Sequence, residues 1–231
     1  TERNIYVTNV PYGSATSMGE LTLALMLLLG RKLNEAQENL RQGVFFLPLG
    51  LELDGKTLGL IGLGHSGKEA AKRAKNFGMT ILAVDKYYER IHSPDVDFLA
   101  GIDQLDKILV ESDFVSLHCP LNEETRGIIG YDQLCKMKDT AYLINIARAG
   151  LVEKDGFIRA LKKQKIAGAG LDVFWEEPIP HDDELLKLEN VVLTPHIATS
   201  TAESRAHNFV QVAKNIKLIA NNEKPEFCVN F

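Results

Sequence analysis

The stretch LGLIGLGHSGKEAAKRAKNFGMTILAVD, residues 58–85, decides the fold of this 231-residue chain. It begins with an apolar run, passes through a glycine-rich turn into an alanine-rich segment, and ends with a second apolar run and an acid. This order predicts a strand, a helix and a second strand that lies parallel to the first.

Three glycines in this stretch have the GxGxxG spacing of a turn that approaches a pyrophosphate. We expect Gly62 to allow the tight turn, Gly64 to let the backbone approach the ligand, and Gly67 to let the helix pack closely on the strand. His65 and Ser66 occupy the variable positions, in the first turn of a helix whose free N–H groups favour an anion. The motif predicts a dinucleotide site, and a glycine turn without a ligand is the alternative.

Asp85 ends the second strand, 18 positions after the last glycine of the turn. A carboxylate at this position is suited to bind the ribose 2′-hydroxyl of NAD, and its charge repels the 2′-phosphate of NADP. The sequence therefore predicts NAD as the cofactor. Lys86, the next residue, keeps NADP open as the alternative.

Short apolar runs and helical patterns alternate from Thr57 onward. The predicted strands are residues 57–61, 79–84, 114–118, 141–146, 167–173 and 190–194, and the predicted helices are residues 66–76, 102–111, 131–136 and 153–163. Several runs are apolar on both faces, as in strands that are covered by helices on both sides. We predict an α/β fold with a doubly wound parallel sheet, closed by a long amphipathic helix over residues 201–221.

The first fifty residues do not follow this alternation. The run NIYVTNV, residues 4–10, predicts a lone strand, and Ser17 with Glu20 three positions later predicts the start of a helix from Met18 to Leu40. This helix is apolar on too many faces for a surface helix. We expect it to form a dimer interface, and the docking site of an absent domain is the alternative.

Composition and charge narrow the class of partner. The formal net charge is −5 and no basic block occurs, which argues against nucleic acid and membrane surfaces as partners. Cys119, Cys135 and Cys228 lack any CxxC spacing, so neither a metal site nor a disulfide framework is predicted. The longest apolar run, residues 21–30, is shorter than the roughly 20 residues that cross a bilayer. We expect a cytoplasmic protein that binds a small molecule.

Polar residues follow the later predicted strands. Arg148 comes after LINIA, Asp172 lies in AGLDVFWEEP together with Glu177, and His196 lies in LTPHIATST. Open α/β sheets bind their ligands at these carboxyl ends. The guanidinium of an arginine can bind a carboxylate through two hydrogen bonds, a histidine can transfer a proton, and a carboxylate can orient the histidine. Together these residue types indicate an acid–base site for a substrate that carries a carboxylate.

The residue pattern alone leaves structural roles open for three of these positions. Arg148 as the salt-bridge partner of a helix carboxylate and His196 as a structural histidine are the alternatives. Glu176 competes with Glu177 for the role of the carboxylate beside the histidine.

Five blocks carry a resemblance to a known family: GKTLGLIGLGHSG, FVSLHCPLNEETRGIIG, LINIARAGLV, AGLDVFWEEP and NVVLTPHIATST. In this order and at these intervals they resemble the NAD-dependent D-isomer-specific 2-hydroxyacid dehydrogenases. The resemblance implies a Rossmann fold and hydride transfer between a small D-2-hydroxy acid, or its 2-oxo acid, and NAD. It implies that Arg148 binds the substrate carboxylate, that His196 is the general acid and base, and that Glu177 holds its imidazole.

The resemblance also implies a set of cofactor-binding residues. His118 to Pro120 with Thr125 correspond to the loop on the adenine side, Ile146 and Ala147 to positions beside the nicotinamide ribose, and Asp172 to the nicotinamide end. The whole predicted set is Gly62, Gly64, His65, Ser66, Gly67, Asp85, His118, Cys119, Pro120, Thr125, Ile146, Ala147, Arg148, Asp172, His196 and Ala198.

The chain departs from the family at Ala149, where glycine is usual, and at His65 and Ser66, where arginine and a β-branched residue are common. It also departs at its front, where a substrate domain is expected. The resemblance predicts three parts: residues 1–15 as the remnant of the substrate domain, 16–200 as the NAD-binding domain with its dimerisation helix, and 201–231 as a helix and tail that return toward the substrate domain. An NAD-sensing module like the related corepressors, or a folded but inactive domain, are the alternative functions.

Overall fold

The glycine-rich stretch forms β1 (Thr57–Ile61) and α3 (His65–Asn76), as predicted. In the computed structural model, which describes residues 5–230, β1 belongs to a seven-stranded parallel sheet with the order β3-β2-β1-β4-β5-β6-β7. The other strands are β2 (Thr80–Val84), β3 (Phe98–Ala100), β4 (Phe114–Leu117), β5 (Tyr142–Asn145), β6 (Gly168–Leu171) and β7 (Val191–Leu193). The predicted doubly wound α/β fold is confirmed.

The strand order reverses between β1 and β4. The chain moves outward from β1 to the edge strand β3, then returns to β4 and moves outward in the other direction to β7. Such a reversal opens a crevice at the carboxyl ends of the strands, where ligands bind in this class of sheet. All six predicted strands are present, but β3 was not predicted because it is only three residues long and half-buried.

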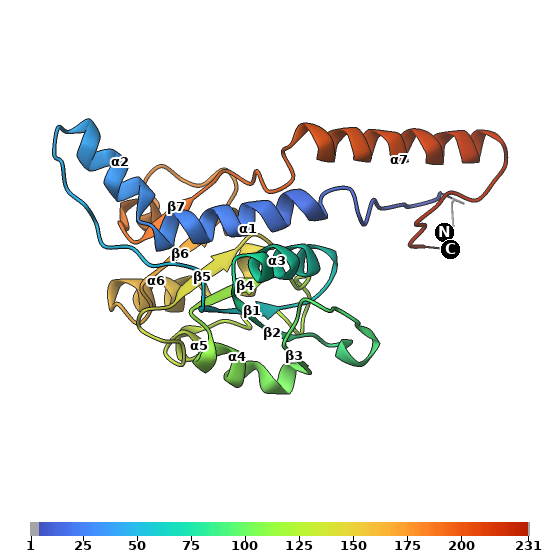
Figure 1. The fold of residues 1–231 in the computed structure, drawn as a ribbon. Helices are drawn as coiled ribbons and strands as arrows, with labels where there is room; N and C mark the ends of the chain where they lie inside the picture. Colours follow the sequence, from blue (N-terminus) through green and yellow to red (C-terminus); the bar gives the residue numbers. More distant parts are fainter. Residues whose placement is uncertain (1–4, 231) are drawn as a thin grey trace.

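Helices cover both faces of the sheet (Figure 1). α1 (Ala15–Gly30) and α3 share one buried core with Leu58 and Leu60 of β1. α4 (Leu105–Glu111), α5 (Tyr131–Leu134) and α6 (Lys154–Lys162) lie over the other face, whose core contains Ile61 of the same strand. Neighbouring residues of a strand thus supply two different cores, which explains why the runs are apolar on both faces.

The predicted single helix from Met18 to Leu40 is wrong in its ends and its continuity. α1 begins after Ser14 and ends at Gly30, and a separate helix, α2 (Leu33–Arg41), follows. Lys32 between them has a φ of 51°, a left-handed conformation that breaks the helical path. Ser17 is not the N-cap but a buried residue of α1, and its hydroxyl lies 2.8 Å from that of Thr201.

One apolar face of α1 is covered by the chain itself. Leu25 and Met26 are fully buried in the core beside α3 and the sheet. Gly19 permits this close packing, because a Cβ there would lie 2.8 Å from the backbone of Glu69 in α3. Met18, Leu21, Leu27 and Leu28 of α1 are only half-buried, and α2 has no buried residue. The dimer interface over residues 18–40 therefore stays a prediction.

α7 (Ala202–Ala220) confirms the predicted C-terminal helix, and the side chain of Thr201 caps it by accepting a hydrogen bond from the N–H of Ser204. The helix does not close the fold, because Phe209 is 72% exposed and Ile216 is 64% exposed. Figure 1 shows α7 extending away from the sheet. No helix in the described part of the chain is long and apolar enough to cross a membrane.

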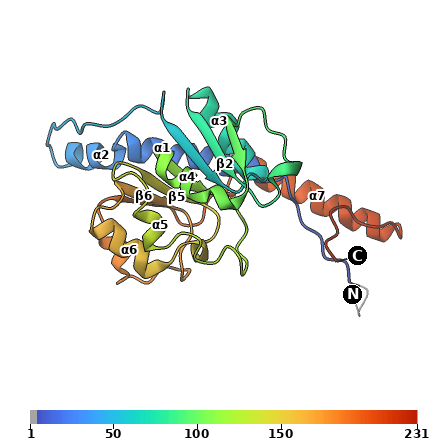
Figure 2. The same cartoon turned by 90° about the horizontal axis from the view of Figure 1, so that it is seen from below.

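The predicted strand NIYVTNV is also wrong for its described residues, 5–10; Asn4 lies outside them. These residues form a single antiparallel bridge, between Thr8 and Cys228, instead of joining the sheet. The N–H of Val229 donates to the carbonyl of Val7 at 2.9 Å, so the two ends of the chain pair with each other. Figure 2 shows the segments near the two ends side by side next to α7.

Candidate active site

The three predicted glycines shape the turn between β1 and α3 in different ways. Gly62 has a φ of 95°, and a Cβ there would lie 2.5 Å from the backbone nitrogen of Cys119. A Cβ on Gly67 would lie 2.5 Å from the carbonyl oxygen of Gly62, so this position needs glycine for close packing. A Cβ on Gly64 would have no described atom within 4 Å. Gly62 and Gly67 therefore close the turn, and Gly64 faces open space that a ligand can enter.

Asp85 follows β2 and is bonded to the backbone on both carboxylate oxygens. It accepts hydrogen bonds from the N–H of Leu63 in the glycine turn and from the N–H of Tyr87, each at 2.8 Å. The ammonium of Lys86 lies 2.6 Å from the carboxylate of Glu124, which raises the pKa of Lys86. Lys86, because of which NADP stayed the alternative cofactor, is thus paired with the carboxylate of Glu124.

A cavity of about 450 Å³ opens beside Asp85 at the carboxyl ends of β1, β2 and β4. Cys119, Pro120 and Thr125, which the family resemblance assigns to the adenine side, line it. The hydroxyl of Thr125 donates to the carbonyl of Pro120 at 2.6 Å and fixes this loop. Burial raises the pKa of the Cys119 thiol to about 11, so it stays protonated.

His118 lies outside this cavity, although the sequence grouped it with the adenine loop. It is 8% exposed and sits beneath the glycine turn. Its Nε2 lies 3.0 Å from the hydroxyl of Ser116, and its Nδ1 lies 3.1 Å from the hydroxyl of Ser66. Burial lowers the pKa of His118 to about 4, so the imidazole is neutral at neutral pH.

Arg148 follows β5 at the start of a short 3-10 helix, η3 (Ala149–Leu151). Buried Asn145 holds this turn, since its amide donates to the carbonyl of Arg148 at 3.0 Å and accepts from the N–H of Ala147 at 3.1 Å. The guanidinium is exposed and donates to the carbonyl of Ala147 at 2.7 Å. Ala149 adopts helical backbone angles, so the residue that replaces glycine here causes no strain. Ile146 and Ala147 are buried beside it.

Glu177 and His196 meet although 19 positions separate them. The Nδ1 of His196 lies 2.7 Å from the Oε2 of Glu177, and the other carboxylate oxygen accepts from the N–H of Phe174 at 2.9 Å. The bond to His196 lowers the pKa of Glu177 most, and the charge of Arg148 contributes too. Glu177, and not Glu176, is therefore the carboxylate beside the histidine.

Asp172 is fully buried and holds the loop that carries His196. One carboxylate oxygen accepts from the hydroxyl of Thr194 at 2.6 Å and from the N–H of Ile197 at 2.9 Å, and the other accepts from the N–H of Ala198 at 2.7 Å. His196 has a φ of 54°, and these bonds fix the strained turn around it. All of these bonds are to the loop itself, whereas the sequence assigned Asp172 to the cofactor.

The sequence did not single out Asn145 or Thr194 as site residues. Both are polar residues at the end of an apolar strand run, and a buried polar group at such a position needs a partner. That signal was available in LINIA and VVLT, but it does not say which partner each residue finds.

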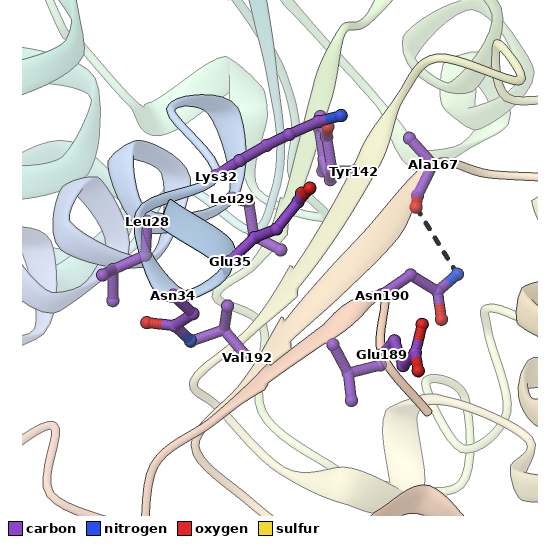
Figure 3. Close-up of a pocket in the computed structure, with 11 residues that line it drawn as sticks. Leu28, Leu29, Lys32, Asn34, Glu35, Tyr142, Ala167, Glu189, Asn190 and Val192 are labelled. Atoms are coloured by element: carbon purple, nitrogen blue, oxygen red, sulfur yellow. Dashed lines mark hydrogen bonds between the residues drawn. The ribbon is translucent and has the colours of Figure 1, made fainter. Parts of the chain in front are cut away.

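A second cavity, of about 260 Å³, lies at the opposite edge of the sheet, beneath the junction of α1 and α2. Figure 3 shows Lys32, Glu35 and Asn190 around it, and the amide of Asn190 donates to the carbonyl of Ala167 at 3.4 Å. None of the predicted site residues lines it. The predicted acid–base residues belong to the carboxyl edge alone.

Residues 23–198 match the family model described as "D-isomer specific 2-hydroxyacid dehydrogenase, NAD binding domain". The chain belongs to this family. The family resemblance that the five sequence blocks carry is confirmed, and the domain that binds NAD in these dehydrogenases accounts for most of this chain.

The similar proteins carry different enzyme names. The chain is 44% identical to a glyoxylate reductase of Korarchaeum cryptofilum, over all of this chain and 70% of that enzyme. It is 43% identical to a D-3-phosphoglycerate dehydrogenase of Methanocaldococcus jannaschii, of which it spans 44%. The crystal structure of D-lactate dehydrogenase with NAD⁺ from Lactobacillus jensenii has a TM-score of 0.88 and 34% identity, over all of this chain and 73% of that one.

Proposed function

We propose that this dehydrogenase-family protein interconverts a small D-2-hydroxy acid and its 2-oxo acid, with NAD as the cofactor. The observation that carries the proposal is the 2.7 Å contact between Nδ1 of His196 and Oε2 of Glu177, in loops at the carboxyl edge of the sheet. When bound, NAD accepts or supplies the hydride. The chain's own residues bind the acid and move the proton.

His196 is the general acid and base of the proposal. Its Nδ1 is engaged with Glu177, which leaves Nε2 as the ring nitrogen for proton exchange with the substrate oxygen. In the oxidation direction the imidazole takes the hydroxyl proton, and the Glu177 carboxylate stabilises the imidazolium that forms. The lowered pKa of Glu177 keeps this carboxylate charged while it does so.

Arg148 is the proposed ligand of the substrate carboxylate. The guanidinium is exposed, and one of its N–H groups already donates to the Ala147 carbonyl, which orients the planar fork. The remaining N–H groups fit a carboxylate in a bidentate manner and stabilise negative charge on the carbonyl oxygen of the 2-oxo acid.

The residues present fit a dinucleotide at the glycine turn. Gly64 faces open space at the amino end of α3, where free N–H groups favour a pyrophosphate. The 450 Å³ cavity beside Asp85 accommodates the adenosine part. Asp85 disfavours a 2′-phosphate, and Lys86 is paired with Glu124 instead of being free to bind one, which supports NAD over NADP.

We also propose that the protein is a homodimer and that it has the three-part domain division predicted from the sequence. Within the predicted interface, residues 18–40, the most exposed large apolar residues lie in α2, where Leu33 is 47% exposed and Leu40 is 63% exposed. Phe45, in the segment that follows, is 85% exposed. Sedimentation analysis of the wild-type protein and a Leu40→Glu variant tests this, since a monomer at micromolar concentration in both would contradict the dimer.

Oxidation of NADH with a panel of 2-oxo acids tests the proposed activity. Turnover of glyoxylate, hydroxypyruvate or pyruvate by the full gene product supports it. Tight NADH binding without turnover of any of them would contradict it and favour a cofactor-sensing module.

A further inference from the structure

A chain of three polar side chains lies beneath the glycine turn. His118, at the end of β4, connects the hydroxyl of Ser116 in that strand to the hydroxyl of Ser66 in the first turn of α3, at 3.0 and 3.1 Å. Ser116 is fully buried, and His118 is 8% exposed. A Cβ on Gly67 would lie 3.4 Å from the Cβ of His118, so the side chain of His118 begins directly against the turn.

The bonding of this chain depends on the tautomer of the neutral imidazole. Burial keeps the imidazole neutral at neutral pH, so one ring nitrogen donates and the other accepts. Among residues 5–230, His118 is the one hydrogen-bond partner of the Ser116 hydroxyl. If Nε2 carried the proton, the hydroxyl hydrogen of Ser116 would be buried without an acceptor, which is costly.

In the tautomer with the proton on Nδ1, the hydroxyl hydrogen of Ser116 and both ring nitrogens of His118 have hydrogen-bond partners. Ser116 then donates to Nε2, and Nδ1–H donates to the oxygen of Ser66. Because the oxygen of Ser66 accepts, its own hydrogen is free to be donated elsewhere. Ser66 is half-buried in the first turn of α3, beside the backbone N–H groups that face an anion.

We propose that His118 is a positioning residue for the cofactor pyrophosphate, holding the Ser66 hydroxyl so that its hydrogen is donated to a phosphate oxygen. The inference rests on the proposed dinucleotide site and assigns that site one side-chain donor in addition to backbone N–H groups. His118 itself touches no ligand and acts through Ser66.

Binding of ligands with and without phosphates tests the proposal. NADH and ADP carry a pyrophosphate, and adenosine does not. Dissociation constants come from NADH fluorescence and from competition by ADP and by adenosine at up to millimolar concentration. We expect Ser66→Ala and His118→Leu each to weaken NADH and ADP about tenfold and to leave adenosine unchanged.

Two further variants separate positioning from structural support. His118→Asn keeps an N–H near the place of Nδ1, and we expect it to retain ADP affinity within about threefold. The double variant Ser66→Ala/His118→Leu is expected to bind ADP no more weakly than either single variant, because both remove one interaction. The ¹⁵N shifts of the His118 ring are expected to report the proton on Nδ1.

Three results would overturn the inference: equal losses for ADP and adenosine, additive losses in the double variant, or a proton on Nε2. Thermal unfolding of each variant verifies that it is folded. Failure of the wild-type protein to bind NADH or ADP would instead contradict the proposed function, so the two failures are distinguishable.

Discussion

The two halves of the carboxyl edge of the sheet hold their functional groups differently. The proposed cofactor half, formed by the glycine turn, Asp85 and the loop after β4, offers backbone N–H groups, and the side chains of Asp85 and Thr125 are hydrogen-bonded to the backbone. In the catalytic half, the side chains of Glu177 and His196 are 38% and 44% exposed, and buried Asp172 holds the loop beneath them. We expect a substitution in the first half to change the shape of the site and the affinity for the cofactor. We expect a substitution of Glu177 or His196 in the second half to change proton transfer.

The largest expected effect is that of His196→Ala. Removing the proposed general acid and base is expected to lower kcat about 10³-fold, while the dissociation constant of NADH changes less than twofold. Steady-state kinetics of the full gene product and fluorescence titration with NADH measure the two quantities. His207→Ala, on exposed α7, is the matched control, and normal turnover of the His196 variant would refute the assignment.

Arg148→Lys is expected to raise the KM for the 2-oxo acid about 100-fold and to lower kcat less, because lysine keeps the charge but loses the bidentate fork. Arg148→Gln is expected to impair both parameters. Kinetics at saturating NADH measure this, and equal KM values for the lysine variant and the wild type would contradict the carboxylate clamp.

Asp172→Asn tests how strongly the buried carboxylate that holds the His196 loop affects turnover, compared with the groups that are proposed to react. The amide has the same size but cannot accept all three hydrogen bonds from the loop, so we expect kcat to fall about tenfold and stability to fall by about 1–3 kcal/mol. Kinetics and urea unfolding are the measurements. A variant that loses NADH affinity but keeps kcat would place Asp172 in the cofactor half instead.

In the proposed cofactor half, substitutions of Gly62 and Gly64 distinguish an effect on stability from an effect on cofactor binding. Gly64→Ala is expected to keep wild-type stability, since its Cβ has no described neighbour within 4 Å, but to weaken NADH about tenfold by obstructing the ligand. Gly62→Ala, at a φ of 95° and 2.5 Å from the Cys119 nitrogen, is expected to destabilise the fold by about 1–3 kcal/mol. Equal stability of both variants would contradict this division.

The smallest effect concerns pH and His118. Its pKa is about 4 in the folded protein, below the unfolded value of about 6.5, so its contribution to stability is full above pH 6.5 and is lost as the pH falls toward 4. Between pH 7.5 and 5.5 the loss is about 1 kcal/mol. Urea unfolding at the two pH values measures it, and His118→Asn is expected to reduce the difference.

Local pattern accounts for the parts of the fold that were predicted correctly. Every predicted strand and helix after Thr57 is present, because apolar periodicity and glycine turns act over a few residues. The predictions failed where contacts between residues far apart in the sequence determine the local structure. The run NIYVTNV has strand composition but pairs with the C-terminal tail, and the apolar helix around Leu25 is broken at Lys32 and covered by α3.

The sequence by itself determined the α/β sheet, the dinucleotide turn, and the residue types of an acid–base site at the carboxyl edge. Only the tertiary structure decided that Nδ1 is the nitrogen of His196 that meets Glu177, that Asp172 holds the loop of His196, and that His118 lies under the turn. The physical reason is that spacing along the chain fixes which edge of the sheet a residue reaches, whereas hydrogen-bond partners are fixed only when separate loops fold against each other.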